Sequence, residues 1–138
     1  MPTPRATIDT GALLALASPR DQYHARAVSI ARAHLAKGGR WVGSVLVLAE
    51  LHGHLLRWRE PRIAHRVLDA VRRDTAYQWI AVDDALIDAA TSNWLLRFPD
   101  QRLSLTDAVT CELMARERIG SVFAFDQDFV VAGYSLQE

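Results

Sequence analysis

Hydrophobic and polar positions along the 138-residue chain follow two different periods. Short segments rich in β-branched and aromatic residues alternate with longer segments whose apolar positions recur at helical spacing. The short segments predict strands over residues 5–8, 40–43, 77–82 and 121–125, with a short edge strand over 133–136. The longer segments predict helices over residues 11–17, 20–36, 45–58, 61–74, 83–97 and 106–118.

Residues at the ends of these segments agree with this assignment. Ser44 is suited to cap the helix that follows it, and Pro61 fits the first turn of the next helix. Alternating strands and helices predict an α/β fold in which helices flank a parallel sheet. The sequence contains no repeat, low-complexity tract or long linker, so we expect one domain over residues 1–138.

Composition indicates an ordinary globular protein. Half of the residues are hydrophobic and 23% are charged. No apolar run approaches the roughly 18 residues that span a bilayer, and the N-terminus lacks a signal-peptide pattern, so we expect a cytoplasmic protein. Cys111 is the only cysteine and cannot form an internal disulfide. It is best interpreted as a small buried residue on a helix.

Charge excludes some classes of protein and points to one basic segment. The 16 basic and 16 acidic residues balance, so the chain as a whole does not favour a polyanion. Residues 57–73 carry six arginines against Glu60 and Asp69, a local balance of 6 − 2 = +4. Lys37 is the only lysine and lies early, which argues against phospho-receivers and aspartyl-phosphate phosphatases. No glycine-rich phosphate-binding motif occurs.

Four acidic residues border apolar segments at positions where α/β proteins bind ligands. Asp9 directly follows the first predicted strand, and Asp126 follows SVFAF. Asp107 lies in the opening turn of a helix, and Glu50 lies within the apolar helix SVLVLAEL. The carboxyl ends of parallel strands meet at one edge of a sheet, so these acids are candidates for a single pocket. Converging carboxylates repel, and must hold protons or bind a hard cation such as Mg²⁺ or Mn²⁺.

Each of these acids also has a purely structural interpretation. Asp9 and Asp107 could be helix-cap residues, and Asp107 fits a capping box with Ser104. Asp126 could be a turn residue, and Glu50 could lie on a solvated helix face. Spacing alone therefore leaves both interpretations open.

The motifs around these acids resemble the PIN-domain ribonucleases, and among them the VapC-type toxins of toxin–antitoxin pairs. IDTGALLAL, SVLVLAEL, LSLTDAVTCELM and FAFDQDF resemble the motifs that carry the family's four acids, in the same order. RDQYHARA resembles a further segment seen in many members, with Asp21 and His24 matching. Gly11 departs from the pattern because many members carry serine there, which leaves Thr10 to supply a hydroxyl. FAFDQDF offers Asp128 as a second acid beside Asp126.

The resemblance implies a three-layer α/β/α sandwich around a mostly parallel sheet. It also implies endonucleolytic cleavage of RNA that depends on Mg²⁺ or Mn²⁺ and leaves 5′-phosphate and 3′-hydroxyl ends. The catalytic and metal-binding residues would be Asp9, Glu50, Asp107 and Asp126, supported by Thr10, Thr106 and Asp128. A cognate antitoxin and a homodimer are the implied protein partners. The alternatives are an RNA-processing nuclease of this fold without an antitoxin, and a non-catalytic domain that binds RNA or protein.

The basic segment is a second candidate surface. Trp58 lies between two arginines in RWRE and could stack on RNA bases beside phosphate contacts, or anchor an antitoxin. The alternative is that Trp58 belongs to the core and the arginines form a solvated face. The candidate contacts are Arg57, Trp58, Arg59, Arg62 and Arg66. Three other tryptophans are expected in the core: Trp41, Trp79 and Trp94.

Two nearby histidines suggest a metal pair but do not fit one. His52 and His54 are two positions apart on a predicted helix and do not share a face. His54 lies four residues after Glu50, so these two can share a face.

Overall fold

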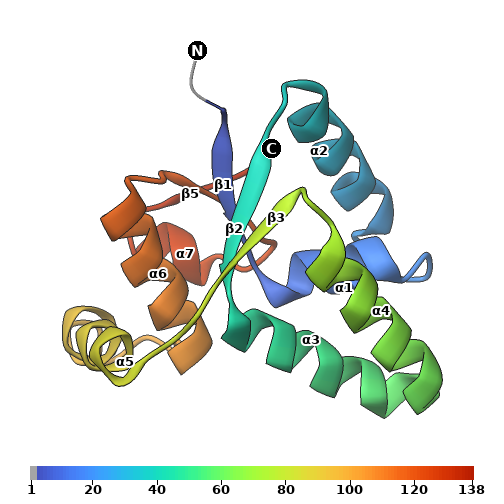
Figure 1. Ribbon diagram of the computed structural model, residues 1–138. Helices are drawn as coiled ribbons and strands as arrows, with labels where there is room; N and C mark the ends of the chain where they lie inside the picture. The colour runs from blue at the N-terminus through green and yellow to red at the C-terminus, as the bar shows by residue number, and fades with distance from the viewer. Residues whose placement is uncertain (1–2) are drawn as a thin grey trace.

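A computed structural model describes residues 3–138 and contains one five-stranded sheet. The strands lie in the order β3-β2-β1-β4-β5, and every neighbouring pair is parallel (Figure 1). Their bounds are β1 Arg5–Ile8, β2 Arg40–Ser44, β3 Tyr77–Ile80, β4 Ser121–Phe123 and β5 Ser135–Leu136.

Helices connect the strands in the predicted alternation. The first half of the chain contributes α1 Thr10–Ala17, α2 His24–Ala36, α3 Val45–Trp58 and α4 Pro61–Arg73. The second half contributes α5 Asp84–Ala90, the π-helical turn η1 Thr91–Leu95, α6 Leu105–Glu117 and α7 Asp128–Val131. Ser44 caps α3 as predicted, because its hydroxyl accepts a hydrogen bond from the N–H of Leu46.

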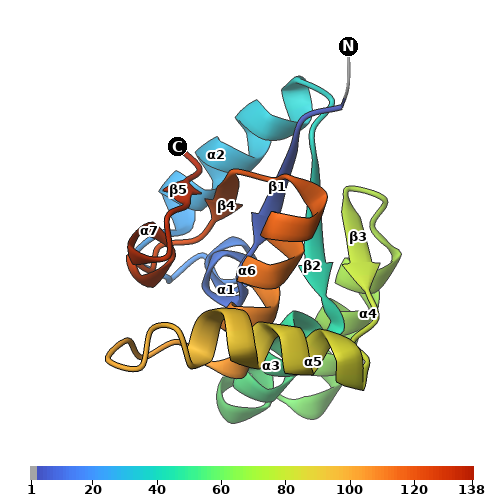
Figure 2. The same cartoon turned by 90° about the vertical axis from the view of Figure 1, so that its left-hand side faces the viewer.

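The sheet separates two apolar cores, as the predicted three-layer α/β/α sandwich requires. Side chains alternate between the faces of each strand, so Trp41 packs on one side and Val42 on the other. The first core lies beneath α1, α2, α3 and part of α4, and the second beneath α5, η1, α6 and α7. Figure 2 shows α5, α6 and α7 on the second face. Cys111 is buried in the second core, as expected.

The second and fifth predicted helices are shorter than expected. The second begins at His24 rather than residue 20, because Pro19 and a turn at Asp21 occupy the chain before it. In that turn the Asp21 carboxylate accepts a hydrogen bond from the N–H of Tyr23 at 2.8 Å. The fifth predicted helix continues past Ala90 only as the π-helical turn η1.

The C-terminal quarter also differs in detail from the predicted pattern. The fourth strand ends at Phe123, two residues early, and α7 was not predicted. The chain needs this extra turn because it must reverse between β4 and its parallel neighbour β5.

Within residues 3–138, no helix combines the length and the apolar character that crossing a bilayer requires.

Candidate active site

The strand order identifies where the sheet forms a crevice. The chain builds outward from β1 through β2 to β3, then returns to the other side of β1 to form β4 and β5. The carboxyl end of β1 therefore lies at the point where the winding direction changes, which is the usual ligand position in open parallel sheets. Asp9 is the first residue after β1, and its N–H donates to the carbonyl of Phe123 on β4.

Glu50 reaches this point from α3 and is held by α1. The Thr10 hydroxyl donates a 2.8 Å hydrogen bond to Oε1 of Glu50. Thr10 is buried and is the first residue of α1, so its hydroxyl is fixed by the packing that also positions Asp9. Thr10 therefore connects α1 to Glu50 of α3 by a direct side-chain contact.

Asp107 and Asp126 make the structural contacts that their sequence positions suggested. Ser104 and Asp107 form a reciprocal capping box at the start of α6, with distances of 3.1 and 3.2 Å. The Asp126 carboxylate accepts from the N–H of Asp128 at 2.9 Å. By contrast, Asp9 occupies the cap position of α1, but its side chain makes no cap hydrogen bond. Its carboxylate therefore has no such structural task.

The neighbouring acids influence the pKa values of Asp9 and Asp107. Burial is the main cause of a rise in the pKa of Asp9 to about 7, and the negative charges of the other three acids raise it further. The N–H of Thr10 offsets part of this rise. Burial also raises the pKa of Asp107; the hydrogen bonds with Ser104 oppose the rise, while the charges of Asp126 and Glu50 add to it. Asp107, Glu50 and Asp126 therefore all lie within electrostatic range of Asp9.

The other two predicted supporting residues lie at the edge of this group. Burial and the charge of Asp126 raise the pKa of Asp128, and Asp128 is not among the influences on Asp9 or Asp107. Thr106 is buried in the first turn of α6, where its carbonyl accepts a hydrogen bond from the Thr110 hydroxyl.

The donor set fits a hard divalent cation, although the carboxylates are not yet gathered around one point. None of the four forms an ion pair with another side chain in residues 3–138. Carboxylate oxygens are the ligands that Mg²⁺ and Mn²⁺ prefer. In the same part of the chain, no three His, Cys, Asp or Glu side chains already form a metal-binding group. Binding a cation would therefore require side-chain adjustment at this site.

A cleft of about 340 Å³ opens beside Asp9 and Asp126 and contains residues that the sequence analysis did not single out. Tyr23 and Phe125 form one wall, with ring centroids 4.5 Å apart and nearly parallel planes. Both lie inside the recognised motifs, Tyr23 in RDQYHARA and Phe125 in FAFDQDF. In the sequence, each of the two is an aromatic residue close to a motif acid, and this alone does not indicate a role in the site. The fold is needed to show that they line the same cleft.

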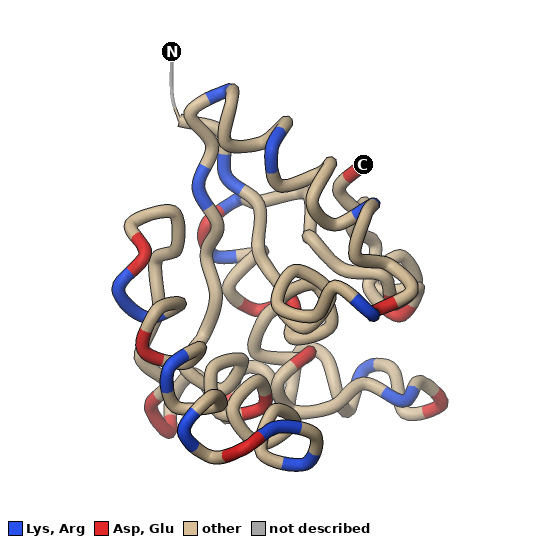
Figure 3. Tube along the Cα trace, turned by 90° about the vertical axis from the view of Figure 1, so that its right-hand side faces the viewer, with Lys and Arg blue, Asp and Glu red and all other residues tan. Residues whose placement is uncertain are grey.

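The basic segment, residues 57–73, contains an exposed tryptophan and solvated arginines. Trp58 is 81% exposed, so the interpretation of this residue as core is wrong. Trp41 and Trp94 are buried as expected, and Trp79 is partly buried. Arg62 makes a 3.9 Å ion pair with Glu60, and both side chains are exposed. Figure 3, seen from the side of α2 and α4, shows basic segments interleaved with acidic ones.

The two histidines of α3 have separate environments, as their spacing predicted. His52 contacts His65 of α4, with 2.8 Å between ring nitrogens. His54 instead lines a pocket with Trp58.

Comparison with known proteins agrees with this architecture. The sequence profile of the PIN domain matches residues 6–133. No curated protein matches the chain. Among solved structures, VapC20 of Mycobacterium tuberculosis, described as a sarcin–ricin loop cleaving toxin, aligns with a TM-score of 0.81 and 29% sequence identity. The alignment covers 94% of this chain and 95% of VapC20.

Two further structures are similar in fold at lower identity. VapBC2 from Rickettsia felis, bound to a DNA fragment from their promoter, aligns with a TM-score of 0.69 and 13% identity. FitAcB from Neisseria gonorrhoeae aligns with a TM-score of 0.67 and 12% identity. Each alignment covers 96% of both chains. The PIN profile extends over nearly the whole sequence and includes all four converging acids, and the chain therefore belongs to the PIN domain family.

Proposed function

We propose that this chain is a Mg²⁺- or Mn²⁺-dependent endoribonuclease and the toxin of a toxin–antitoxin pair. One observation carries the proposal: Asp9 lies after the central strand, withdrawn from solvent and within electrostatic range of Asp107, Glu50 and Asp126, and none of the four forms an ion pair with a cationic side chain in residues 3–138. An arrangement of this kind is costly to maintain for stability alone. The family and the described activity of VapC20 support RNA as the substrate.

The four acids would divide the work by position. Asp9, Asp107 and Asp126 would hold the cation, and Glu50 would supply a further ligand oxygen or orient the attacking water. When bound, the cation would lower the pKa of a water and stabilise charge on the attacked phosphate. Thr10 acts through Glu50, because its hydroxyl fixes one carboxylate oxygen. The packing of α1 against the sheet keeps Asp9 at the strand end, so the site depends on the fold being intact.

Cation binding can be tested before the RNA target is known. We expect Mn²⁺ to raise the thermal unfolding midpoint of the purified chain, since a ligand at 100 times its Kd stabilises by about 2.7 kcal/mol. Asp9→Asn and Asp107→Asn should lose this response, whereas Asp84→Asn, which changes an exposed acid in the first turn of α5, should keep it. An equal response in all four proteins would contradict the proposed metal site.

Cleavage is the second test, and the described target of VapC20 suggests the first substrate. A sarcin–ricin stem-loop RNA should be cut in the presence of Mg²⁺ or Mn²⁺ and yield 5′-phosphate and 3′-hydroxyl ends. Asp107→Asn should abolish cutting while leaving the circular dichroism spectrum unchanged. Full activity in that variant would exclude the assigned chemistry.

The toxin assignment also predicts protein partners. We propose that the chain forms a homodimer and associates with a small antitoxin, and the VapBC2 complex supports the second part. A short adjacent gene for a DNA-binding protein, whose product binds this chain and suppresses cleavage, would satisfy the prediction. Cleavage without such a gene product would instead identify an RNA-processing nuclease.

A further inference from the structure

A second pocket adjoins the acidic cleft and shares part of its wall. This pocket, of about 450 Å³, lies between α1, the turn before α2, and the end of α3. Leu14 and Asp21 line both the pocket and the cleft, so the two hollows are neighbours separated by one ridge. An extended chain bound at the acids can therefore continue over that ridge into the second pocket.

Each hollow presents one exposed aromatic residue. In the cleft, Tyr23 is stacked on Phe125 at 4.5 Å and still remains 39% exposed. Phe125 covers one face of the Tyr23 ring, and the opposite face is the one on which a further ring can stack. The Asp21 carboxylate accepts the N–H of Tyr23, and this fixes the start of α2. The Tyr23 ring is thus held in place with a face available for stacking.

Trp58 is the corresponding residue of the second pocket. It ends α3 and is 81% exposed, although the neighbouring pocket residues Leu14 and Leu55 are largely covered. An indole is the largest aromatic surface available to a protein, and bases of any sequence stack on such surfaces.

The charges around the second pocket favour a nucleic acid strand over a protein segment. Arg20 and Arg59 line the pocket, and Arg57 is exposed next to Trp58. The only acid in the lining is Asp21, which is already engaged by the N–H of Tyr23. Near the cleft, the Arg26 guanidinium lies 6.0 Å from the Phe125 ring centroid. Arginines between aromatic faces suit a chain that carries one phosphate per base.

We propose that Tyr23 and Trp58 are stacking platforms for bases of one single-stranded RNA segment on either side of the Leu14–Asp21 ridge. The Tyr23 base lies beside the acidic cleft, and the strand continues across the ridge to Trp58, with Arg20 and Arg59 contacting its phosphates. The two platforms select for unpaired RNA, because paired bases do not expose their faces. This inference rests on the proposed function for the nature of the ligand.

Binding measured without catalysis tests the inference separately from the nuclease activity. The probe is a fluorescein-labelled eight-nucleotide single-stranded RNA of mixed sequence, titrated with the full chain in EDTA and followed by anisotropy. We expect Tyr23→Leu and Trp58→Leu each to weaken binding by roughly 5- to 160-fold, the range for loss of one stacked base. Trp58→Phe should restore most of the affinity. A duplex of the same sequence should bind all proteins weakly and without this difference.

Matched controls separate stacking and phosphate contacts from general effects. Arg59→Gln should weaken binding, whereas Arg72→Gln, an equal charge change on the exposed surface of α4, should weaken it less. Leu96→Ala removes another exposed apolar side chain, outside both hollows, and should have no effect. Intrinsic fluorescence should be quenched by RNA in the parent and not in Trp58→Leu.

The outcomes distinguish this inference from the proposed function. Cleavage-competent protein whose Tyr23 and Trp58 variants bind RNA like the parent overturns the inference and leaves the nuclease intact. Ring-dependent RNA binding by a chain that cuts no RNA supports the inference and contradicts the nuclease. If Trp58→Leu binds RNA normally but no longer binds the purified product of the adjacent gene, the pocket is a protein-docking surface and the inference is wrong.

Discussion

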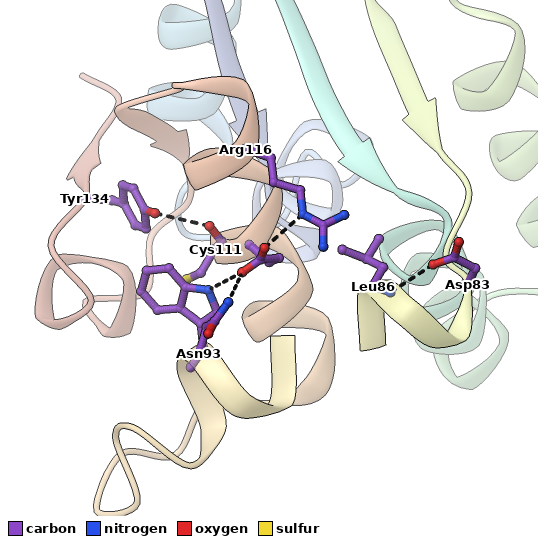
Figure 4. A network of polar contacts seen from close by, with 8 residues as sticks. Asp83, Leu86, Asn93, Cys111, Arg116 and Tyr134 are labelled. Carbon is purple, nitrogen blue, oxygen red and sulfur yellow. Dashed lines mark hydrogen bonds and ion pairs between the residues drawn. The ribbon is translucent and has the colours of Figure 1, made fainter. Parts of the chain in front are cut away.

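Glu112 and Asp9 are two carboxylates removed from solvent, and their surroundings shift their pKa values in opposite directions. Glu112, in the middle of α6, is 7% exposed and accepts hydrogen bonds from Asn93, Trp94 and Arg116 at 2.9 to 3.2 Å. Figure 4 shows Asn93 and Arg116 directed to this carboxylate from η1 and α6. Burial alone would raise the pKa of Glu112, but these hydrogen bonds and the Arg116 charge outweigh it and lower the pKa.

Asp9 is also withdrawn from solvent, but it lacks the compensation that Glu112 receives. Its carboxylate has no ion pair among the described residues, and its neighbours add three further negative charges. The two sites are linked by α6, which carries Glu112 in its interior and Asp107 in its first turn. The contrast shows that the chain supplies a cationic partner to the buried Glu112, and that Asp9 has none among the described residues.

Removing Glu112 should have the largest effect on stability. Glu112→Ala leaves the Asn93 amide, the Trp94 indole N–H and the Arg116 guanidinium without their shared acceptor, so we expect about 3 kcal/mol of destabilisation in urea unfolding. Arg116→Ala, which removes a half-exposed partner, should cost less than about 1 kcal/mol. A loss below about 1 kcal/mol in Glu112→Ala would mean that the network does not hold η1 against α6.

The same residue predicts a pH dependence with a defined sign. The folded state holds the pKa of Glu112 below its ordinary value of 4.5, so the unfolded chain binds its proton first. The stabilisation from Glu112 is complete above pH 4.5 and declines as the pH falls below it. Parallel unfolding curves should show this decline in the parent and its absence in Glu112→Gln.

Asp9→Asn should increase stability, and this should be the next largest effect on the free energy of unfolding. Because the folded pKa of Asp9 is about 7 and the ordinary value is 3.8, ionised Asp9 opposes folding increasingly as the pH rises between these values. In EDTA at about pH 8 we expect the variant to be more stable by about 1–2 kcal/mol, a figure discounted for the partial solvent access of this side chain. At about pH 4 the difference should vanish. A destabilised variant at the higher pH would contradict the contrast with Glu112.

Most helices and strands of this fold could be predicted from the sequence, but two turns could not. The strands and most helices could be predicted because their apolar periods and their end residues, such as Ser44 and Ser104, are local. The turn before α2 could not, because it depends on Pro19 and on Asp21 bonding back to the chain. The π-helical turn η1 also escaped prediction, since its Asn93 and Trp94 bind Glu112 almost twenty residues away.

The same limit applies to the site. The four acids could be found because each lies in a short motif at a strand or helix end. Glu112 and Asp107 both lie in LTDAVTCELM, and only Glu112 has a basic residue four positions later, Arg116. The contacts of Glu112 with Asn93 and Trp94 could not be predicted, because they depend on which donors the fold brings near. The aromatic wall of Tyr23 and Phe125 was missed for the same reason, since the two residues are far apart in the chain.

Thr7 is an uncharged residue that allows the stability cost of an unsatisfied buried polar group to be measured. Its Oγ1 is buried in β1 and has no hydrogen-bond partner in the described chain. Thr7→Val keeps the shape of the side chain and removes the hydroxyl, so we expect about 1 kcal/mol of stabilisation, independent of pH. The gain should appear in urea unfolding at both about pH 4 and about pH 8. A pH-dependent gain would mean that the hydroxyl interacts with Asp9 after all.

Gly11→Ser should have the smallest effect on stability, and it tests the difference between Asp9 and Glu112 most directly. An ideal Cβ at Gly11 lies 3.8 Å from Oδ2 of Asp9, an ordinary contact, so serine fits without displacing the backbone. Its hydroxyl can donate a hydrogen bond to the Asp9 carboxylate, and this favours the charged form of Asp9. Asp9 would then accept a side-chain hydrogen bond, as Glu112 does. We expect a stability change within about 0.5 kcal/mol and a downward shift of the Asp9 pKa in a carboxyl NMR titration. An unchanged pKa would mean that the high value is set by burial and the other acids alone, so that one added donor cannot compensate for them.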